Sequence, residues 1–178
     1  ALEIILRAEH VYIMGIRSCA PLASFMAFYF NLILDNVHLI HTNNSSEVFE
    51  QMVRISEKDV IIGISFPRYS MRTLKAMEFA NNRNAKVITL TDSVHSPMNL
   101  YSSCNLIANS DMASIVDSLV APLSVINALI VALCMKKQSE VAKTLEMLED
   151  IWDEYQVYES DEINHIDDHI KTRYAKLE

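Results

Sequence analysis

DVIIGISFPRYSMRTLKAMEFANNRN, residues 59–84, joins an apolar run to a segment of helical length through a loop with two serines, a proline, an arginine and a tyrosine. Residues 59–65 show little alternation of polar and apolar side chains, which predicts a strand buried on both faces of a sheet. The loop offers hydroxyl and guanidinium donors, so it can hold an anion. It can equally be a turn that Pro67 shapes and Ser70 caps.

The same pattern recurs along the chain. Further apolar runs lie at 10–15, 37–41, 86–91 and 104–108, and stretches of helical length at 20–34 and 45–56 separate the first three strands. Strands that alternate with helices predict βαβ units and a parallel sheet covered on both faces, an α/β sandwich. In such a sheet, ligands bind outside the carboxyl ends of the strands, where the strand order reverses.

Three loops at that edge carry hydroxyls where a helix begins: GIRSCAP (15–21), ISFPRYS (64–70) and TDSVHSPM (91–98). In the first, Gly15, Arg17 and Ser18 can form an anion site at a helix start, although a glycine and a serine cap are also ordinary helix-start chemistry. In the third, Ser96 precedes Pro97, a pairing typical of a helix start.

The second loop is richer in ligand chemistry. Ser65, Tyr69 and Ser70 supply hydroxyls, and Arg68 can contact a phosphate through two hydrogen bonds at once. These residues are candidate phosphate-binding groups, and the alternative is that Arg68 and Tyr69 are only solvated.

Composition limits the possible functions. The chain has 178 residues, half of them apolar, which predicts one globular domain with a sizeable core. Residues 140–168 hold eleven acidic residues and one lysine, net −10, so the remainder is net +2 and shows no basic face for nucleic acid. Three widely spaced cysteines predict neither a disulfide framework nor a zinc site. No signal peptide is visible, so we expect a cytoplasmic protein.

The chain changes character after residue 112. Residues 112–135 are apolar almost all round and long enough to span a membrane, but Asp117 and Asn127 favour a buried helix that packs on a partner subunit. Residues 139–178 look helical throughout, and an apolar stripe lines one face of the predicted helix. We therefore divide the chain into a domain, 1–138, and an acidic helical extension, 139–178, that packs on the domain or on a partner. The stripe consists of Ile163, Ile166, Ile170, Tyr174 and Leu177.

The order of these motifs resembles a known family. Gly15–Ser18 after a strand, then DVIIGISFPRYS, AKVITLTDSVHSPM (85–98) and SSCNLIAN (102–109), are similar to the sugar isomerase (SIS) domain. The closest resemblance is to the effector domain of RpiR-type transcriptional regulators. It covers residues 8–138.

The resemblance implies a three-layer sandwich with a five-stranded parallel sheet in flavodoxin-like order, a homodimer or tetramer, and a phosphosugar bound at the strand ends. The family's phosphate loop usually reads S-x-S-G-x-T. Here Ser65 matches the first serine, Pro67 replaces the second, Arg68 replaces the glycine and Ser70 stands for the threonine. Ser18 matches the first-loop serine that faces the phosphate, with Arg17 beside it.

Isomerisation of a sugar phosphate needs a base, most often Glu or His. Glu47, His41 and His95 follow predicted strands, but a helix cap, a strand end and a solvated loop are the simpler explanations of these residues. Glu47 and Ser96 are therefore secondary candidates for ligand contact. His165 and His169, four residues apart, lack a third metal ligand at fixed spacing, and we expect no metal and no cofactor.

The sequence thus favours a non-catalytic sugar-phosphate sensor that forms oligomers and does not enter a membrane. The chain begins at Ala1 as if within a helix, so we expect an upstream helix-turn-helix domain to supply any contact with DNA. A phosphosugar isomerase is the alternative, and an interaction module with an empty pocket is the third possibility.

Overall fold

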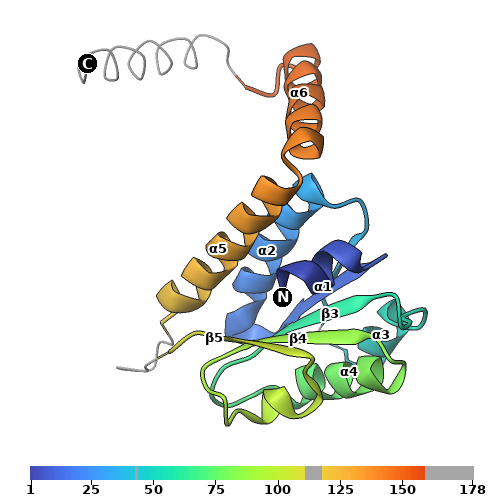
Figure 1. Cartoon of the computed structure of the whole chain (residues 1–178), viewed down its shortest axis with the longest axis vertical. Helices are drawn as coiled ribbons and strands as arrows, with labels where there is room; N and C mark the ends of the chain where they lie inside the picture. The colour runs from blue at the N-terminus through green and yellow to red at the C-terminus, as the bar shows by residue number, and fades with distance from the viewer. Residues whose placement is uncertain (43, 111–117, 159–178) are drawn as a thin grey trace. The chain divides into compact units, whose positions relative to one another are not determined.

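The fold is an α/β sandwich, seen in a computed structural model that describes residues 1–42, 44–110 and 118–158 (Figure 1). The chain divides into two units, Ala1–Gln138 and Ser139–Glu178. Each unit is described by itself, and the candidate site belongs to the first.

A single five-stranded sheet organises the first unit. Its strands pair in the order β2-β1-β3-β4-β5, and every pair is parallel. This is the flavodoxin-like order, so the expected fold class is confirmed and each strand lies within a residue or two of its predicted run. The strands are β1 (Val11–Gly15), β2 (Val37–Ile40), β3 (Val60–Ile64), β4 (Lys86–Thr91) and β5 (Cys104–Ile107).

Burial explains why the strands could be recognised in the sequence. Every residue of β1 and β3 is buried, as is β4 after Lys86, because helices cover both faces of the sheet. The edge strands β2 and β5 are only partly buried. Continuous apolar runs therefore mark the inner strands.

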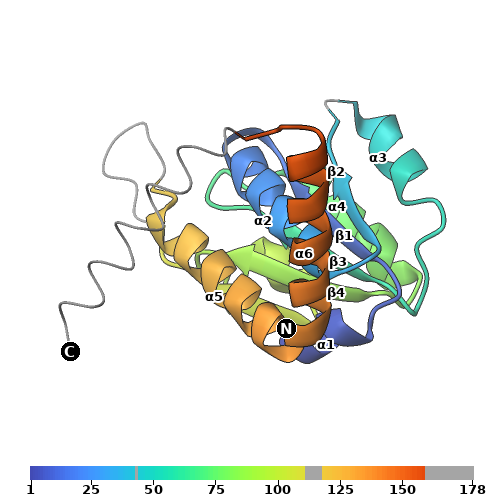
Figure 2. The same ribbon diagram turned by 90° about the horizontal axis from the view of Figure 1, so that it is seen from above.

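The helices form two layers (Figures 1 and 2). The helices α1 (Leu2–Arg7), α2 (Ala20–Ile33) and α5 (Val120–Lys136) cover one face, and α2 contacts both β1 and α5. The other face is covered by α3 (Ser45–Gln51), α4 (Met71–Asn82) and the short 3₁₀ helix η2 (Pro97–Tyr101).

Helix α3 is shorter than the predicted stretch 45–56. It ends at Gln51, and the chain then turns, with the Ile55 N–H donating to the Met52 carbonyl at 3.0 Å. Met52 and Ile55 lie in the core, at 0% and 2% exposure. The Val53 carbonyl, which a continued helix would pair with a backbone N–H, accepts from the Arg83 guanidinium at 2.9 Å instead.

The apolar segment predicted at 112–135 begins as helix α5 only at Val120, and residues 111–117 lie outside the described chain. Pro122, Ile126 and Leu133 are buried, and α5 packs against α2. Among the helices of the described residues, none alone has the length and apolar character of a membrane span; α5 and α6 (Gln138–Glu154) reach that length only as a pair with a sharp bend between them.

The second unit contains α6 (Gln138–Glu154). The expectation of a helix throughout 139–178 is wrong, because α6 ends at Glu154 in a Schellman-type cap. Gln156 adopts φ 52°, and the Val157 N–H donates to the Trp152 carbonyl at 2.9 Å. The apolar stripe 163–177, with His165 and His169, lies outside the described residues.

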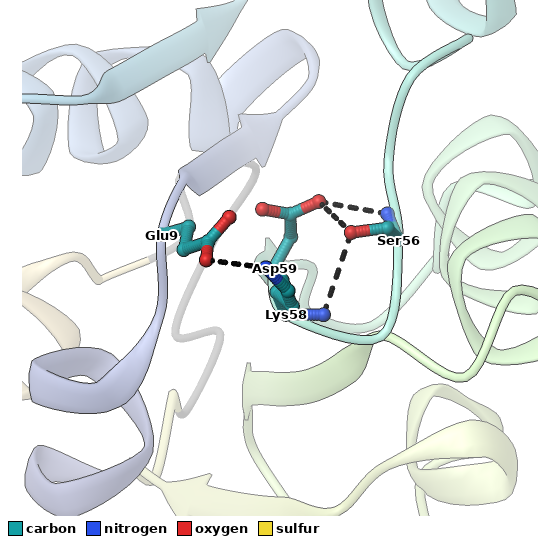
Figure 3. A network of polar contacts seen from close by, with 4 residues as sticks. All are labelled: Glu9, Ser56, Lys58 and Asp59. Atoms are coloured by element: carbon teal, nitrogen blue, oxygen red, sulfur yellow. Dashed lines mark hydrogen bonds and ion pairs between the residues drawn. The ribbon is translucent and has the colours of Figure 1, made fainter.

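The amino ends of β1 and β3 are joined by polar contacts (Figure 3). Lys58 Nζ lies 2.8 Å from Glu9 Oε1, and the Glu9 N–H donates to the Lys58 carbonyl at 2.9 Å. Asp59, only 3% exposed, accepts from the Ser56 N–H at 2.7 Å and its hydroxyl at 2.9 Å. These contacts close the turn that leads into β3.

Both glycines of the chain lie in inner strands where a side chain has no room. A Cβ on Gly15 would lie 2.6 Å from the Cys19 carbonyl oxygen, whereas one on Gly63 would overlap Sδ of the flexible Met77. Gly15→Ala should therefore lower the free energy of unfolding by about 3 kcal/mol and Gly63→Ala by about 1 kcal/mol. Urea denaturation of both variants checks the order, and equal losses would contradict it.

The paired imidazoles of His10 and His38 should make stability sensitive to acid. Their Nδ1 and Nε2 atoms lie 3.1 Å apart, and the His38 ring stacks on Tyr12 at 4.9 Å. Burial of part of the ring, then the charge of His10, lower the His38 pKa, while Asp59 opposes them. This contribution to stability is complete above the unfolded pKa of about 6.5 and is lost as pH falls through the lower folded value.

His38→Gln should accordingly lose less stability than the native chain between pH 7.5 and pH 5. Urea denaturation across this range measures the difference. His95→Gln, which alters an exposed loop histidine, is the control and should follow the native curve. Parallel curves for His38→Gln and the native chain would overturn the assignment.

Candidate functional site

The strand order reverses between β1 and β3. Gly15 and Ile64, the last residues of these strands, are register partners, so the two strands end level. From there β1 continues toward α2 on one face and β3 toward α4 on the other. The first two predicted ligand loops are therefore brought together at the point where sheets of this order bind ligands.

The β1–α2 loop is tight because of Gly15. The 3₁₀ turn η1 (Arg17–Cys19) folds back so that the Cys19 carbonyl lies over the Gly15 Cα, and α2 follows with Pro21 in its first turn. Arg17 and Ser18 lie exposed at this turn, and Arg17 adopts φ 58°. The predicted first-loop residues are thus at the carboxyl end of β1.

The β3–α4 loop is built around Ser65, which is 3% exposed. Its N–H donates to the Leu90 carbonyl of β4 at 3.1 Å, and its hydroxyl accepts from the Ser70 N–H at 3.0 Å. Ser70 caps α4, since its hydroxyl accepts from the Thr73 N–H at 3.3 Å. Ser65 and Ser70 therefore hold the loop in shape, and the positive end of the α4 dipole faces it.

Arg68 adopts φ 68°. A residue with a Cβ pays about 1 to 2 kcal/mol in this left-handed region, where glycine pays almost nothing. The loop thus holds an arginine in a backbone conformation that favours glycine. Strained residues of this kind persist only where the surrounding structure holds them in place, and they are concentrated at functional sites.

Tyr69 joins this loop to the next. Its hydroxyl donates to Asp92 Oδ1 at 2.9 Å, and its ring packs against the core. Partial burial, then the hydrogen bond to Asp92, raise the Tyr69 pKa, with Ser96 opposing. Tyr69 is therefore anchored in protein contacts, and its predicted ligand contact stays a prediction.

The β4–η2 loop contains a chain of hydroxyls. Thr91 Oγ1 lies 3.1 Å from Asp92 Oδ1 and 2.9 Å from Ser96 Oγ, and the Met98 N–H donates to Ser96 at 3.3 Å. A carboxylate only accepts and a hydroxyl has one proton, so Thr91 donates to Asp92 and accepts from Ser96. Ser96 is 5% exposed, and its hydroxyl is already engaged by Thr91 and as the N-cap of η2.

Glu47 occupies a helix start. Asn44 caps α3 by accepting from the Ser46 N–H at 3.2 Å, and Glu47 accepts from the Thr42 hydroxyl and from Asn44 Nδ2. His41 is exposed just after β2, and His95 is exposed in the β4–η2 loop. In the described residues, no group of three His, Cys, Asp or Glu could hold a metal ion.

Two hollows of the described surface lie elsewhere. One of about 630 Å³ is open at the end of β5 beside the start of α5, next to residues outside the described chain. The other, about 210 Å³, lies at the amino ends of the strands and is lined by charges of both signs, from Glu3 to Lys86. The candidate site is instead the β1/β3 switch point, where the hydroxyl and guanidinium donors of two loops come together. A hollow without such donors has no groups suited to binding an anion.

Fold and loop chemistry together define a class: a doubly wound α/β domain with hydroxyl and guanidinium donors at its switch point. Within that class the family is clear. The SIS domain family matches residues 4–132, and the chain belongs to it. No curated protein sequence matches the chain significantly.

Solved structures share the fold. The sugar isomerase domain of an RpiR transcription factor from Sphaerobacter thermophilus is 24% identical, with a TM-score of 0.79 over 84% of this chain and 83% of that one. The Vibrio vulnificus NanR protein, solved with ManNAc-6P, is 19% identical, with a TM-score of 0.72. This match covers 84% of the chain but 59% of NanR, so the chain spans about three fifths of that protein.

A third similar structure comes from Methanococcus jannaschii. It is 13% identical, with a TM-score of 0.64 over 80% of each chain, and a 3-hexulose-6-phosphate isomerase function has been inferred for it. Structures with this fold therefore include a transcription-factor domain and a protein for which isomerase activity has been inferred. At these identities the likeness establishes the fold alone.

The left-handed position of Arg68 can be tested by matched variants. Arg68→Gly and Arg68→Ala both remove the guanidinium, but only glycine relieves the backbone. Arg68→Gly should exceed Arg68→Ala in free energy of unfolding by about 1 kcal/mol. Chemical denaturation measures the difference. If the alanine variant is as stable as the glycine variant, the loop does not hold this residue in the left-handed region.

Proposed function

We propose that the chain is the sugar-phosphate-sensing effector domain of an RpiR-type transcriptional regulator and that it has no catalytic role of its own. The observation that carries the proposal is the pair of loops at the β1/β3 switch point. Each presents an arginine in the left-handed conformation beside serine hydroxyls and a helix start. The likeness to an RpiR sugar isomerase domain and to NanR with its ManNAc-6P supports it.

In this proposal the phosphate lies between the two loops. Arg17 and Arg68 supply positive charge, and Ser18 and Ser70 supply hydroxyls. Ser65 holds the loop in shape by accepting from the Ser70 N–H. Arginine charge compensates for the serine that Pro67 replaces. Tyr69 lies at the border with the β4–η2 loop, and Glu47 and Ser96 remain secondary candidates.

Sensing would act through subunits. We propose a homodimer or tetramer, supported by the exposed Phe28 of α2 and by Val131 and Met135 of α5, at 62%, 57% and 75% exposure. A bound sugar phosphate would favour one arrangement of subunits and so alter the spacing of DNA-reading domains outside this sequence. The extension 139–178 is proposed to pack on the domain or on a partner subunit.

A screen of sugar phosphates by thermal shift tests the proposal. The panel contains hexose, pentose and amino-sugar phosphates, N-acetylmannosamine 6-phosphate among them, with inorganic phosphate and unphosphorylated sugars as controls. A ligand at about one hundred times its dissociation constant should add about 2.7 kcal/mol of stability. Arg68→Gly should weaken its binding about 10- to 100-fold by removing a charge-assisted contact.

Arg7→Ala is the matched control. Its side chain is 83% exposed on α1, at a distance in the fold from the strand-end loops, so the shift should persist. If no sugar phosphate raises the melting temperature of the native chain, the sensing role is refuted and the interaction module remains.

A phosphosugar isomerase is the second candidate, favoured by the likeness to the Methanococcus jannaschii protein. It would need an acid or base near the sugar, and Glu47, the residue suited to this by type, accepts from Thr42 and Asn44 at a helix start. Time-resolved proton NMR of aldose and ketose phosphates separates the two functions. Turnover interconverts the signals, whereas binding alone does not.

A further inference from the structure

We propose that Asp92 determines ligand specificity by accepting hydrogen bonds from the hydroxyl groups of a sugar whose phosphate lies in the β3–α4 loop. This inference rests on the proposed function and adds to it the part of the site that reads the sugar. Three features of the structure support it: the position of Asp92, the way its carboxylate is held, and the chemistry of the residues around it.

Asp92 lies beside the phosphate loop. The Ser65 N–H donates to the Leu90 carbonyl at 3.1 Å, which places the start of that loop two residues before Asp92 on the neighbouring strand. Tyr69 closes the other side, with its hydroxyl 2.9 Å from Asp92 Oδ1. A ligand anchored between Ser18 and Arg68 would therefore extend toward Asp92 if its sugar lies over β3 and β4.

The carboxylate is held in place by protein donors. Oδ1 accepts from Tyr69 and from Thr91; Thr91 accepts in turn from Ser96, whose hydroxyl accepts from the Met98 N–H. Thr91 and Ser96 are 0% and 5% exposed, so this support is buried. A carboxylate has about four acceptor positions, and the two protein donors use two on Oδ1. Oδ2 takes part in neither contact, and Asp92 itself is only partly buried.

The loops around the candidate site carry few carboxylates. In residues 16–19, 65–70 and 92–96, all of them described, Asp92 is the only carboxylate. Arginines, hydroxyls and a helix start suit the phosphate, but they offer the sugar few strong acceptors. A negative charge next to a phosphate site is unfavourable for the phosphate, so Asp92 has a role in binding only through the neutral, hydroxyl-bearing part of the ligand.

The inference predicts that one variant changes the binding of two ligands differently. Asp92→Asn keeps the size of the side chain and an acceptor for Tyr69 and Thr91, but removes the charge. Isothermal titration with the best-binding sugar phosphate among glucose 6-phosphate, glucosamine 6-phosphate and N-acetylmannosamine 6-phosphate should show about 10- to 100-fold weaker binding. Binding of inorganic phosphate should stay equal or become tighter, because a repulsive charge is gone.

Two further variants complete the design. Tyr69→Phe removes the link between the loops but keeps the carboxylate, so it should weaken the sugar phosphate less than Asp92→Asn does. Asp35→Asn makes the same change of charge on an exposed residue between α2 and β2, at the opposite edge of the sheet, and should change neither probe. Melting temperatures without ligand show whether each variant is folded.

The outcomes distinguish this inference from the proposed function. If the native chain binds no sugar phosphate, the proposed function fails and the inference falls with it. If the native chain binds, but Asp92→Asn weakens both probes equally or neither, Asp92 only shapes the loop and the inference alone is overturned. Selective loss of the sugar phosphate supports it.

Discussion

The parallel pairing of β1 with β3, inside a sheet covered on both faces, is the constraint on which the rest of the structure depends. Each inner strand must satisfy its backbone hydrogen bonds with two parallel neighbours, so every connection crosses a face through a helix. The chain leaves β1 toward one face and β3 toward the other. The loops that follow these two strands therefore meet at one edge, and the residues on them become neighbours although about fifty positions separate them.

At that edge of the sheet, arginines and not glycines adopt the left-handed backbone conformation. Both glycines lie in inner strands, where Gly15 meets the Cys19 carbonyl and Gly63 meets Met77, so neither occupies a left-handed position. Those positions in the two loops belong to Arg17 and Arg68. The fold thus accepts about 1 to 2 kcal/mol of strain at each. An arginine side chain at these points supplies charge that a glycine could not, which agrees with recognition of an anion.

Much of the candidate site could be predicted because its residues follow strands that are easy to recognise. Ser65 and Ser70 were predicted at a strand end and a helix start, and they lie there. The contacts of Asp92 were not predicted, because nothing in TDSVHSPM distinguishes a turn aspartate from one held by Tyr69 and a buried Thr91. The signal that could have found it was the absence of any other carboxylate on the three loops.

Hydrophobic patterning, read from the sequence alone, determined the five strands, the helices between them and the edge at which the loops lie. The inner strands were the clearest, because burial on both faces requires continuous apolar runs. It could not determine where helices end, since Arg83, thirty positions away, pairs with the Val53 carbonyl just after α3 and a Schellman-type cap ends α6. The tertiary structure alone decided which loops touch. The hydrogen bond from Tyr69 to Asp92 joins residues 23 positions apart, and only packing brings them within reach.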